Sequence, residues 1–211
     1  LAEVARRFYG HPEESLRLAG VTGTNGKTTI STLLRHLLQA DGSQWGLVGT
    51  VRYHLGRRSI PSYKTTPDSA DLAAFFRQMA DAGCAGACLE VSSHALHQDR
   101  VHGFHFRVAA FTNLTRDHLD YHGSMDSYAA VKARLFAWPQ LKCRVINLDD
   151  PFGRELAEQE MEGKALFDYF KMHEEEPQRR QKIEDPYLCG KGFLVATHSS
   201  GRNLMWDGIK K

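Results

Sequence analysis

A glycine-rich turn near the N-terminus carries the residue types needed to bind a phosphate chain. Such a turn before a helix presents backbone N–H groups and the positive end of the helix to an anion, and a following lysine neutralises the charge. Gly23, Gly26 and Lys27 stand where these roles require them. Thr28 can place its hydroxyl on a magnesium ion that bridges the outer phosphates. The spacing departs from the general G-x-x-x-x-G-K-S/T form, which has glycine where Val21 stands. We predict nucleotide binding by Gly23, Thr24, Asn25, Gly26, Lys27, Thr28 and Thr29.

A glutamate interrupts a segment that is otherwise apolar. Residues 87–91 read Ala-Cys-Leu-Glu-Val, which is typical of a strand buried on both faces. An ionised carboxylate is costly there unless it meets a cation, and magnesium is the cation that accompanies bound phosphates. Glu90 is therefore predicted as a metal ligand beside Thr28. The alternative is a glutamate at the edge of the strand that points into solvent.

Lys132 shares a helical stripe with apolar residues. It lies four residues after Tyr128, three before Leu135 and four before Phe136, so it faces the interior with them. A buried amine loses its proton easily, and the neutral amine can react. Lys132 is therefore a candidate for chemical modification or catalysis. The alternative is a lysine that lays its stem over the core and keeps its charge in water.

Histidines gather in the polar segments that follow the predicted strands. His118 lies in the cluster at residues 115–122, where an imidazole could bind a metal or orient a phosphate. Two H-x-x-H pairs lack acids or cysteines arranged for a closed zinc site. We expect their four histidines to lie at the surface or to form hydrogen bonds; they are His94, His97, His102 and His105.

Strands and helices alternate around these residues. Buried strands are predicted at residues 16–21, 45–50, 87–91, 108–112 and 144–148. A polar segment that contains glycine is predicted at residues 52–59. Helices are predicted from apolar residues at helical spacing: Ile30, Leu33, Leu34, Leu37 and Leu38; Leu72, Phe75, Phe76 and Met79, between a cap at Asp68 or Ser69 and Gly83; and residues 125–137. The alternation predicts an α/β, doubly wound, mostly parallel sheet, which binds ligands beyond the carboxyl ends of its strands.

The last quarter of the chain has a different composition. Residues 171–185 are dominated by charge, which is typical of a solvated helix or loop. A further pair of strands is predicted at residues 192–197 and 204–206.

Composition excludes several classes of partner. The 211 residues include 27 Lys plus Arg and 25 Asp plus Glu, and a net charge of +2 gives no long-range attraction for nucleic acid or anionic lipid. No signal peptide opens the sequence, and no apolar run approaches the ~20 residues of a membrane helix. The cysteines match neither a zinc site nor a secreted disulfide framework, so we expect free thiols in the cytoplasm at Cys84, Cys88, Cys143 and Cys189.

Six segments together resemble the Mur ligases, the family that builds the peptide of bacterial peptidoglycan. They read GVTGTNGKTT, TTPDS, EVSSH, FTNLTRDHLDYHG, YAAVKARLF and NLDD, in the family's order and spacing, at residues 20–29, 65–69, 90–94, 111–123, 128–136 and 147–150. Within the family the likeness is to the tripeptide-synthetase branch.

The resemblance implies roles for individual residues. Residues 23–29 would bind ATP, Thr28 and Glu90 would hold one magnesium ion, and His118 would help to hold a second. Lys132 matches the lysine that the family carbamylates, and carbon dioxide on its nitrogen would turn an inward lysine into a carboxylate metal ligand. The catalytic residues so implied are Lys27, Lys132 and His118. The positions that match contacts to the muramoyl-peptide substrate are Thr65, Thr66, Ser92, Gln98 and Arg100.

The implied activity is an ATP-dependent ligation that forms an amide bond in peptidoglycan synthesis. A diamino acid, meso-diaminopimelate or L-lysine, would be added to UDP-N-acetylmuramoyl-L-alanyl-D-glutamate. The substrate carboxylate would attack the γ-phosphate of ATP, and the incoming amine would displace phosphate from the acyl-phosphate. Lys27 and two magnesium ions would stabilise the charge on the transferred group, so no protein nucleophile is needed. We expect a monomer without nucleic-acid or membrane partners.

The resemblance covers residues 5–159 and implies three parts. Residues 1–16 would be the linker from a UDP-binding domain, residues 17–167 the ATP-binding central domain, and residues 168–211 the end of that domain or an appendage. The family's first domain and its third, which selects the incoming amino acid, would lie outside this sequence, so we expect the chain alone to bind ATP without ligation. Lys64 departs from the family's pattern, which has asparagine before the paired threonines.

Three alternatives share part of this pattern. A folylpolyglutamate synthase has the same Thr-Asn-Gly-Lys turn and two-metal scheme, but residues 65–68 and 117–122 speak against it. A P-loop NTPase switch or kinase would carry an Asn-Lys-x-Asp loop that reads a base, and the sequence has none. The third is a module that binds ATP and magnesium without turnover.

Overall fold

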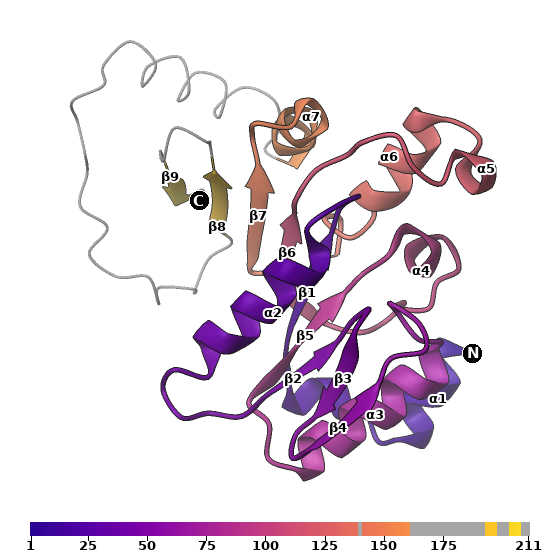
Figure 1. The fold of residues 1–211 in the computed structure, drawn as a ribbon, viewed down its shortest axis with the longest axis vertical. Coiled ribbons are helices and arrows are strands. Elements are labelled where there is room, and N and C mark those ends of the chain that lie inside the picture. The colour runs from indigo at the N-terminus through magenta and orange to yellow at the C-terminus, as the bar shows by residue number, and fades with distance from the viewer. Residues whose placement is uncertain (139–140, 161–192, 198–202, 208–211) are drawn as a thin grey trace.

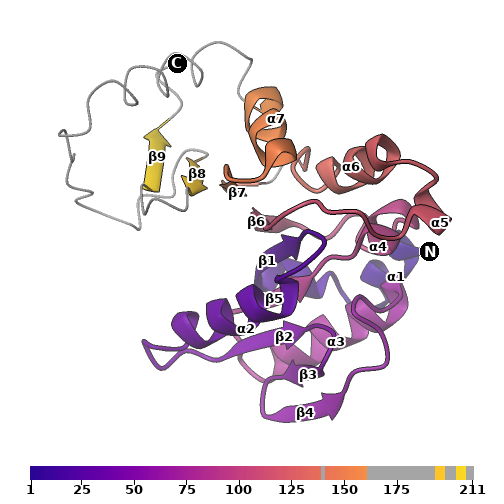
Figure 2. The same ribbon diagram turned by 45° about the horizontal axis from the view of Figure 1, so that its top comes forward.

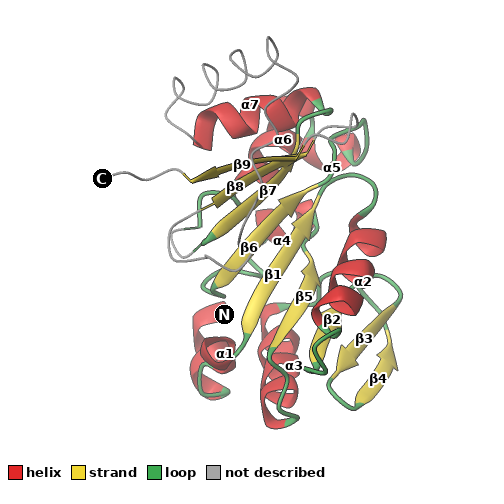
Figure 3. Cartoon of the chain, turned by 90° about the vertical axis from the view of Figure 1, so that its left-hand side faces the viewer, coloured by secondary structure: helices red, strands yellow, loops and turns green. Residues whose placement is uncertain are grey.

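In the part of the chain that the structure describes, a nine-stranded sheet carries helices on both faces (Figure 1). The computed structural model describes residues 1–138, 141–160, 193–197 and 203–207. The strand order is β4-β3-β2-β5-β1-β6-β7-β8-β9. Six central strands are parallel: β2 (Trp45–Val48), β5 (Gly86–Glu90), β1 (Arg17–Thr22), β6 (Phe106–Phe111), β7 (Cys143–Asn147) and β8 (Phe193–Thr197). The predicted mostly parallel α/β sheet is confirmed, and Figure 3 shows β5, β1 and β6 pointing the same way, so that their carboxyl ends meet at one edge.

Antiparallel strands lie at both sides of this parallel core. The prediction of a polar segment at residues 52–59 was wrong, because β3 (Arg52–Leu55) and β4 (Arg58–Pro61) form a hairpin. Gly56 has a φ of 83° in its turn, a conformation that favours glycine. Only alternate residues of β3, Tyr53 and Leu55, are buried, so its apolar signal is short. At the other side β9 (Asn203–Asp207) pairs with β8, which confirms the strand pair predicted at residues 192–197 and 204–206.

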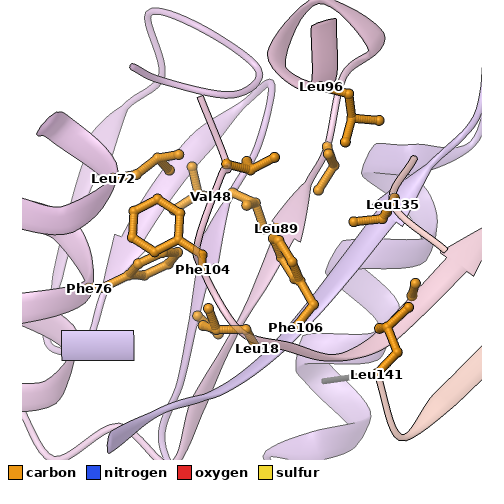
Figure 4. Packing of buried hydrophobic residues seen from close by; sticks show 14 of the residues in the cluster. Leu18, Val48, Leu72, Phe76, Leu89, Leu96, Phe104, Phe106, Leu135 and Leu141 are labelled. Atoms are coloured by element: carbon orange, nitrogen blue, oxygen red, sulfur yellow. The ribbon is translucent and has the colours of Figure 1, made fainter. Parts of the chain in front are cut away.

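Successive strand residues point to opposite faces of the sheet, so two apolar layers form. On one face Leu18 and Leu89 pack with α3 (Ser69–Asp81) in the main core, which Figure 4 shows from close by. The inward stripe of α3 is the predicted one, Leu72, Phe75, Phe76 and Met79. On the other face Ala19 and Cys88 pack with α2 (Lys27–Leu38), which contributes Leu34 and Leu38, whereas Ile30, Leu33 and Leu37 are exposed.

The remaining helices differ from the prediction in their lengths and limits. α6 (Met125–Ala133) ends four residues before the predicted limit, although Leu135 and Phe136 beyond it are fully buried. α4 (Ser93–His97) begins in a segment expected to be a loop, and the Ser92 hydroxyl caps it by accepting a hydrogen bond from the Ala95 N–H. Two more helices, α5 (Leu119–His122) and α7 (Pro151–Glu160), follow β6 and β7.

Residues 1–16, predicted as a linker, form α1 (Ala2–Phe8) and a 3-10 helix (Pro12–Ser15) that contact α3. A buried ion pair between Arg6 and Glu13, 2.6 Å long, joins them. Cys84 and Cys88 are buried free thiols, as predicted, and Cys143 is half-buried; Cys189 and the charged residues 171–185 lie outside the described residues. No helix in the described part of the chain has the length and apolar character to cross a membrane.

Removing the Phe76 ring should destabilise the protein strongly. Phe76 is fully buried and packs edge-on against Phe104 at 5.1 Å between ring centroids. We expect Phe76→Ala to lower the free energy of unfolding by about 3–5 kcal/mol. Phe8→Ala is the matched control, because Phe8 is 80% exposed, and it should cost less than about 1 kcal/mol. Urea unfolding of the three proteins measures both values, and equal losses would contradict the described core.

Candidate functional site

The candidate residues converge where three adjacent strands end. β1 lies between β5 and β6, and the register pairs Val21 with Glu90 and Thr22 with Phe111. The segments that leave these strands therefore start side by side, as Figure 2 shows for β1, β5 and β6. The predicted ligand edge of the sheet is the place where the sequence motifs meet.

The glycine-rich turn is held by the segment that follows β6. The N–H groups of Thr24 and Asn25 donate to the backbone oxygen and the side-chain Oδ1 of Asn113, at 2.8 and 2.9 Å. Gly23 allows the close approach, because a Cβ there would lie 1.9 Å from the Thr112 hydroxyl. Gly26 precedes α2 with a φ of 84°, so the two glycines serve different needs.

Lys27 folds back over this turn. Its Nζ donates to the backbone oxygens of Gly23 and Thr24, each at 2.9 Å. Burial lowers the pKa of Lys27, while the charges of Glu90 and Asp117 oppose that shift. A cation is thus held at the centre of the turn, where a phosphate needs it.

Glu90 lies in the interior with its carboxylate held by hydroxyl and amide donors. The residue is 1% exposed, so the alternative of a solvent-facing edge glutamate is wrong. The Thr28 hydroxyl donates to Oε2, the Thr50 hydroxyl donates to the same oxygen, and the Thr50 N–H donates to Oε1, all at 2.9 Å. Among the described residues no lysine, arginine or histidine lies within 4.0 Å of this carboxylate. A buried anion beside a threonine hydroxyl and without an ion-pair partner fits a divalent cation.

Thr50 is a site residue that the sequence analysis missed. It follows β2 at the same edge of the sheet, and its hydroxyl also lies 3.1 Å from that of Thr65. Gly49 makes room for the contact, because a Cβ there would lie 2.1 Å from Glu90 Oε1. The signal was the Gly-Thr pair directly after a buried strand, the position at which the other site segments also begin.

Lys132 reaches the same centre from α6. It is 1% exposed, so the alternative of a lysine with its charge in water is wrong. Its Nζ donates to the Gly23 oxygen at 2.9 Å and lies 4.5 Å from the centroid of the Tyr128 ring. Burial, aided by the charge of Lys27 and opposed by Asp117, lowers the pKa of Lys132 to about 7. The amine is therefore partly neutral near physiological pH.

His118 lies beside this centre on the loop that starts α5. Its φ of 51° is in the left-handed region, its Nε2 is 3.5 Å from Asp117 Oδ2, and its side chain is 46% exposed. Its ring centroid is 6.2 Å from that of Tyr128, whose hydroxyl is 3.2 Å from that of Thr24. His118 thus belongs to the wall of the site, one side chain away from the glycine-rich turn.

Further histidines extend this wall. The rings of His94 and His118 are 4.9 Å apart, and His97 Nδ1 is 2.8 Å from the Tyr121 hydroxyl. The hydrogen-bonding role predicted for His97 is confirmed. His122, which was not singled out, bonds through Nε2 to the Ser93 hydroxyl at 2.9 Å.

The five candidate substrate residues form one connected group next to Glu90. The Thr66 hydroxyl donates to the Glu90 backbone oxygen at 2.7 Å and accepts from the Ser92 N–H at 3.0 Å. The Arg100 guanidinium donates to the Thr66 backbone oxygen and to Gln98 Oε1, each at 2.9 Å. Further links in the group are Thr65 to Thr50, Gln98 to Tyr121, Arg100 to Asp68, and Asp68 to Lys64.

The chain is similar to known proteins in sequence and fold. The family model described as the Mur ligase middle domain matches residues 21–198. A relative from Ectopseudomonas mendocina (strain ymp), a UDP-N-acetylmuramoyl-L-alanyl-D-glutamate–2,6-diaminopimelate ligase, is 51% identical over 166 residues, which cover 79% of this chain and 34% of the relative. A solved structure of a ligase with the same name has a TM-score of 0.64 and 28% identity, over 96% of this chain and 43% of that one.

A second kind of ligase shares the fold. The ADP complex of Mycobacterium tuberculosis folylpolyglutamate synthase has a TM-score of 0.60 at 21% identity, over 75% of this chain and 43% of that one. At this identity the likeness concerns the fold alone. The chain spans about a third of the length of the curated relatives that it matches.

The buried amine should make stability depend on pH. Unfolding returns the pKa of Lys132 from about 7 to its ordinary 10.5, so the unfolded state binds more protons between these values and stability rises with pH. Between about pH 7 and about pH 9, in buffer free of carbon dioxide, the wild type should gain about 2 kcal/mol relative to Lys132→Met. Urea unfolding at both pH values measures the difference. Lys142→Met changes an exposed lysine and should keep the wild-type response. A pH response that Lys132→Met leaves unchanged would contradict the shifted pKa.

Proposed function

We propose a function for this chain from one premise. The chain belongs to the Mur ligase family, whose middle-domain model matches residues 21–198. Its role is to bind ATP and the carboxylate substrate of a ligase that joins 2,6-diaminopimelate to UDP-N-acetylmuramoyl-L-alanyl-D-glutamate in peptidoglycan synthesis. The observation that carries the proposal is the network at Glu90. Its carboxylate accepts from Thr28 of the glycine-rich turn, and its backbone oxygen accepts from Thr66 of the candidate substrate group. One residue thus touches both the phosphate-binding segment and the substrate segment.

The names of the relatives supply the substrates in this proposal. The relative at 51% identity and the solved structure at 28% identity are both called 2,6-diaminopimelate ligases. Of the two diamino acids that the sequence left open, we therefore choose diaminopimelate. The likeness to folylpolyglutamate synthase is one of fold, and it does not favour a folate substrate.

The glycine-rich turn binds the phosphates of ATP. The side chain of Lys27 already spans the turn, and it leaves the Gly23 and Thr24 oxygens for the phosphate chain when the nucleotide binds. The start of α2 adds its free N–H groups. The free thiols of Cys84 and Cys88 fit a reducing compartment, and we place the reaction in the cytoplasm.

Thr28 and Glu90 are the residues that would hold a first magnesium ion. Thr28 Oγ1 and Glu90 Oε2 lie 2.9 Å apart, and the buried carboxylate lacks a cationic partner among the described residues. Both observations fit a bound magnesium ion. His118 and a carbamylated Lys132 would hold a second ion. Bound magnesium supplies positive charge that offsets the charge on the transferred phosphoryl group.

Carbamylation of Lys132 accounts for a lysine in the interior. The lone pair of Nζ forms a bond to carbon dioxide, one C=O electron pair moves to oxygen, and the amine proton leaves to solvent. The pKa of about 7 makes the neutral amine available for this step near neutrality. The product is a carboxylate where a buried cation stood, and hard cations prefer oxygen ligands.

The other residues orient the two reactants. Thr65, Thr66 and Arg100 hold the muramoyl dipeptide so that its terminal carboxylate meets the γ-phosphate, with Ser92 and Gln98 beside them. Carboxylate oxygen attacks phosphorus, ADP leaves, and the amine of diaminopimelate then displaces phosphate from the acyl-phosphate. The protein's task is to position reactants and offset charge. We assign phosphorylation of the carboxylate and formation of the amide to a protein of the relatives' full length, and expect this chain alone to bind ATP without forming tripeptide.

ATP binding should depend on Lys27. Calorimetric titration of the chain with ATP and magnesium should show saturable binding, and Lys27→Ala should weaken it at least about tenfold, because a charged hydrogen-bond partner of the phosphates is lost. Lys142→Ala, which removes an exposed lysine, is the matched control and should bind as the wild type does. No heat from the wild type, or equal heat from Lys27→Ala, would overturn the nucleotide assignment.

Carbamylation should be visible by carbon NMR. With ¹³C-labelled bicarbonate, the wild type should show a carbamate resonance that magnesium and ATP strengthen and that Lys132→Met abolishes. Lys142→Met should keep the signal. A spectrum without a carbamate resonance in the wild type, under conditions in which ATP binds, would refute the modification while leaving the nucleotide assignment intact.

A further inference from the structure

Tyr53 has a buried hydroxyl whose hydrogen bonds all go to one short segment. The residue lies on β3 and is fully buried, with its ring against Phe75 at 5.1 Å and Tyr63 at 5.5 Å between centroids. Its hydroxyl donates to the Lys64 oxygen at 2.5 Å and accepts from the N–H groups of Lys64 and Tyr63 at 2.9 and 3.3 Å. One donor and two acceptor positions are all that a hydroxyl offers. All the hydrogen bonds that this hydroxyl can form therefore go to the backbone of two neighbouring residues, Tyr63 and Lys64.

The segment that Tyr53 holds leads directly into the candidate substrate group. Residues 62–68 connect β4 to α3 and belong to no helix or strand, so no hydrogen-bond ladder holds them. Thr65 and Thr66 follow Lys64 directly. The Thr65 hydroxyl lies 3.1 Å from the Thr50 hydroxyl, and the Thr66 hydroxyl donates to the Glu90 backbone oxygen at 2.7 Å. A shift of Lys64 would therefore move both threonines relative to the metal-binding edge.

We propose that Tyr53 is a positioning residue for the muramoyl-dipeptide site. It acts through the hydrogen bonds between its hydroxyl and the backbone of Tyr63 and Lys64. The inference rests on the proposed function and adds to it a residue that touches no reactant. Lys64 and Tyr63 are exposed, so their backbone groups can turn to water when the Tyr53 hydroxyl is removed. The loss then falls on the order of this segment rather than on the fold, because the ring of a phenylalanine still fills the core.

Tyr63 supplies a matched control. Its hydroxyl donates to Asp71 Oδ2 at 2.6 Å, on the surface of α3, and the residue is 58% exposed. Tyr63→Phe removes the same atom as Tyr53→Phe, from the same segment, but it leaves the backbone contacts of Lys64 in place. A simple effect of deleting a hydroxyl would appear in both variants.

The test compares the wild type, Tyr53→Phe and Tyr63→Phe. It measures the affinity for two ligands and the rate of amide exchange in residues 62–68. We expect Tyr53→Phe to raise the Kd for UDP-N-acetylmuramoyl-L-alanyl-D-glutamate about tenfold or more while the Kd for ATP with magnesium stays within about twofold. The backbone amides of Tyr63 and Lys64 should exchange at least about tenfold faster, with the amides of β1 and β5 unchanged. Tyr63→Phe should resemble the wild type in all three measurements.

Three results would overturn the inference, and they differ from one another. Unchanged dipeptide affinity and unchanged amide exchange in Tyr53→Phe would show that the hydroxyl positions nothing. An equal loss of affinity for both ligands, with faster amide exchange throughout the sheet, would show a general structural role. A wild type that binds ATP but no dipeptide would reject the proposed substrate, and with it the role of Tyr53, and this result is distinguishable because it precedes any substitution.

Discussion

The site depends on a carboxylate kept in the interior at the end of a central strand. An ionised group in such a place costs several kcal/mol unless donors or a cation compensate it. Glu90 receives donors from Thr28 at the start of α2 and from Thr50 after β2, and its own backbone oxygen receives Thr66. These partners come from three separate segments, and they can meet because parallel neighbours bring their carboxyl ends to one edge. The same strand end therefore organises the segments for which we propose metal, phosphate and substrate binding.

A single backbone oxygen ties the other half of the site together. The Gly23 oxygen accepts from Lys27 and Lys132, whose Nζ atoms arrive from α2 and α6. Burial is the main cause that lowers the pKa of Lys132, and repulsion from the charged amine of Lys27 at the same acceptor adds to it. An amine that gives up its proton near neutrality is also one that carbon dioxide can modify. The burial of Lys132 and its place beside Lys27 thus both favour the chemistry proposed for it.

Several particulars could be read from the residues before the structure was known. The glycine-rich turn, the inward lysine and the alternating apolar segments each follow a local period or a local motif. The β3–β4 hairpin could not be read in this way, because Tyr53 and Leu55 are its only buried residues in the first strand. Thr50 was missed for a different reason: its partners Glu90 and Thr65 are far along the chain, and a lone threonine after a strand has no period.

The sequence by itself determined the kinds of most elements and their alternation along the chain, and the residue types able to bind phosphate and a divalent cation. It did so because these features depend on neighbours within a few positions, where backbone geometry sets the spacing. Only the tertiary structure decided that Glu90 is buried among threonine donors, that Lys132 shares an acceptor with Lys27, and that Tyr53 forms hydrogen bonds with the backbone of Lys64. Burial and hydrogen bonds across the sheet follow from strand order and register, and those are settled by the packing of the whole core.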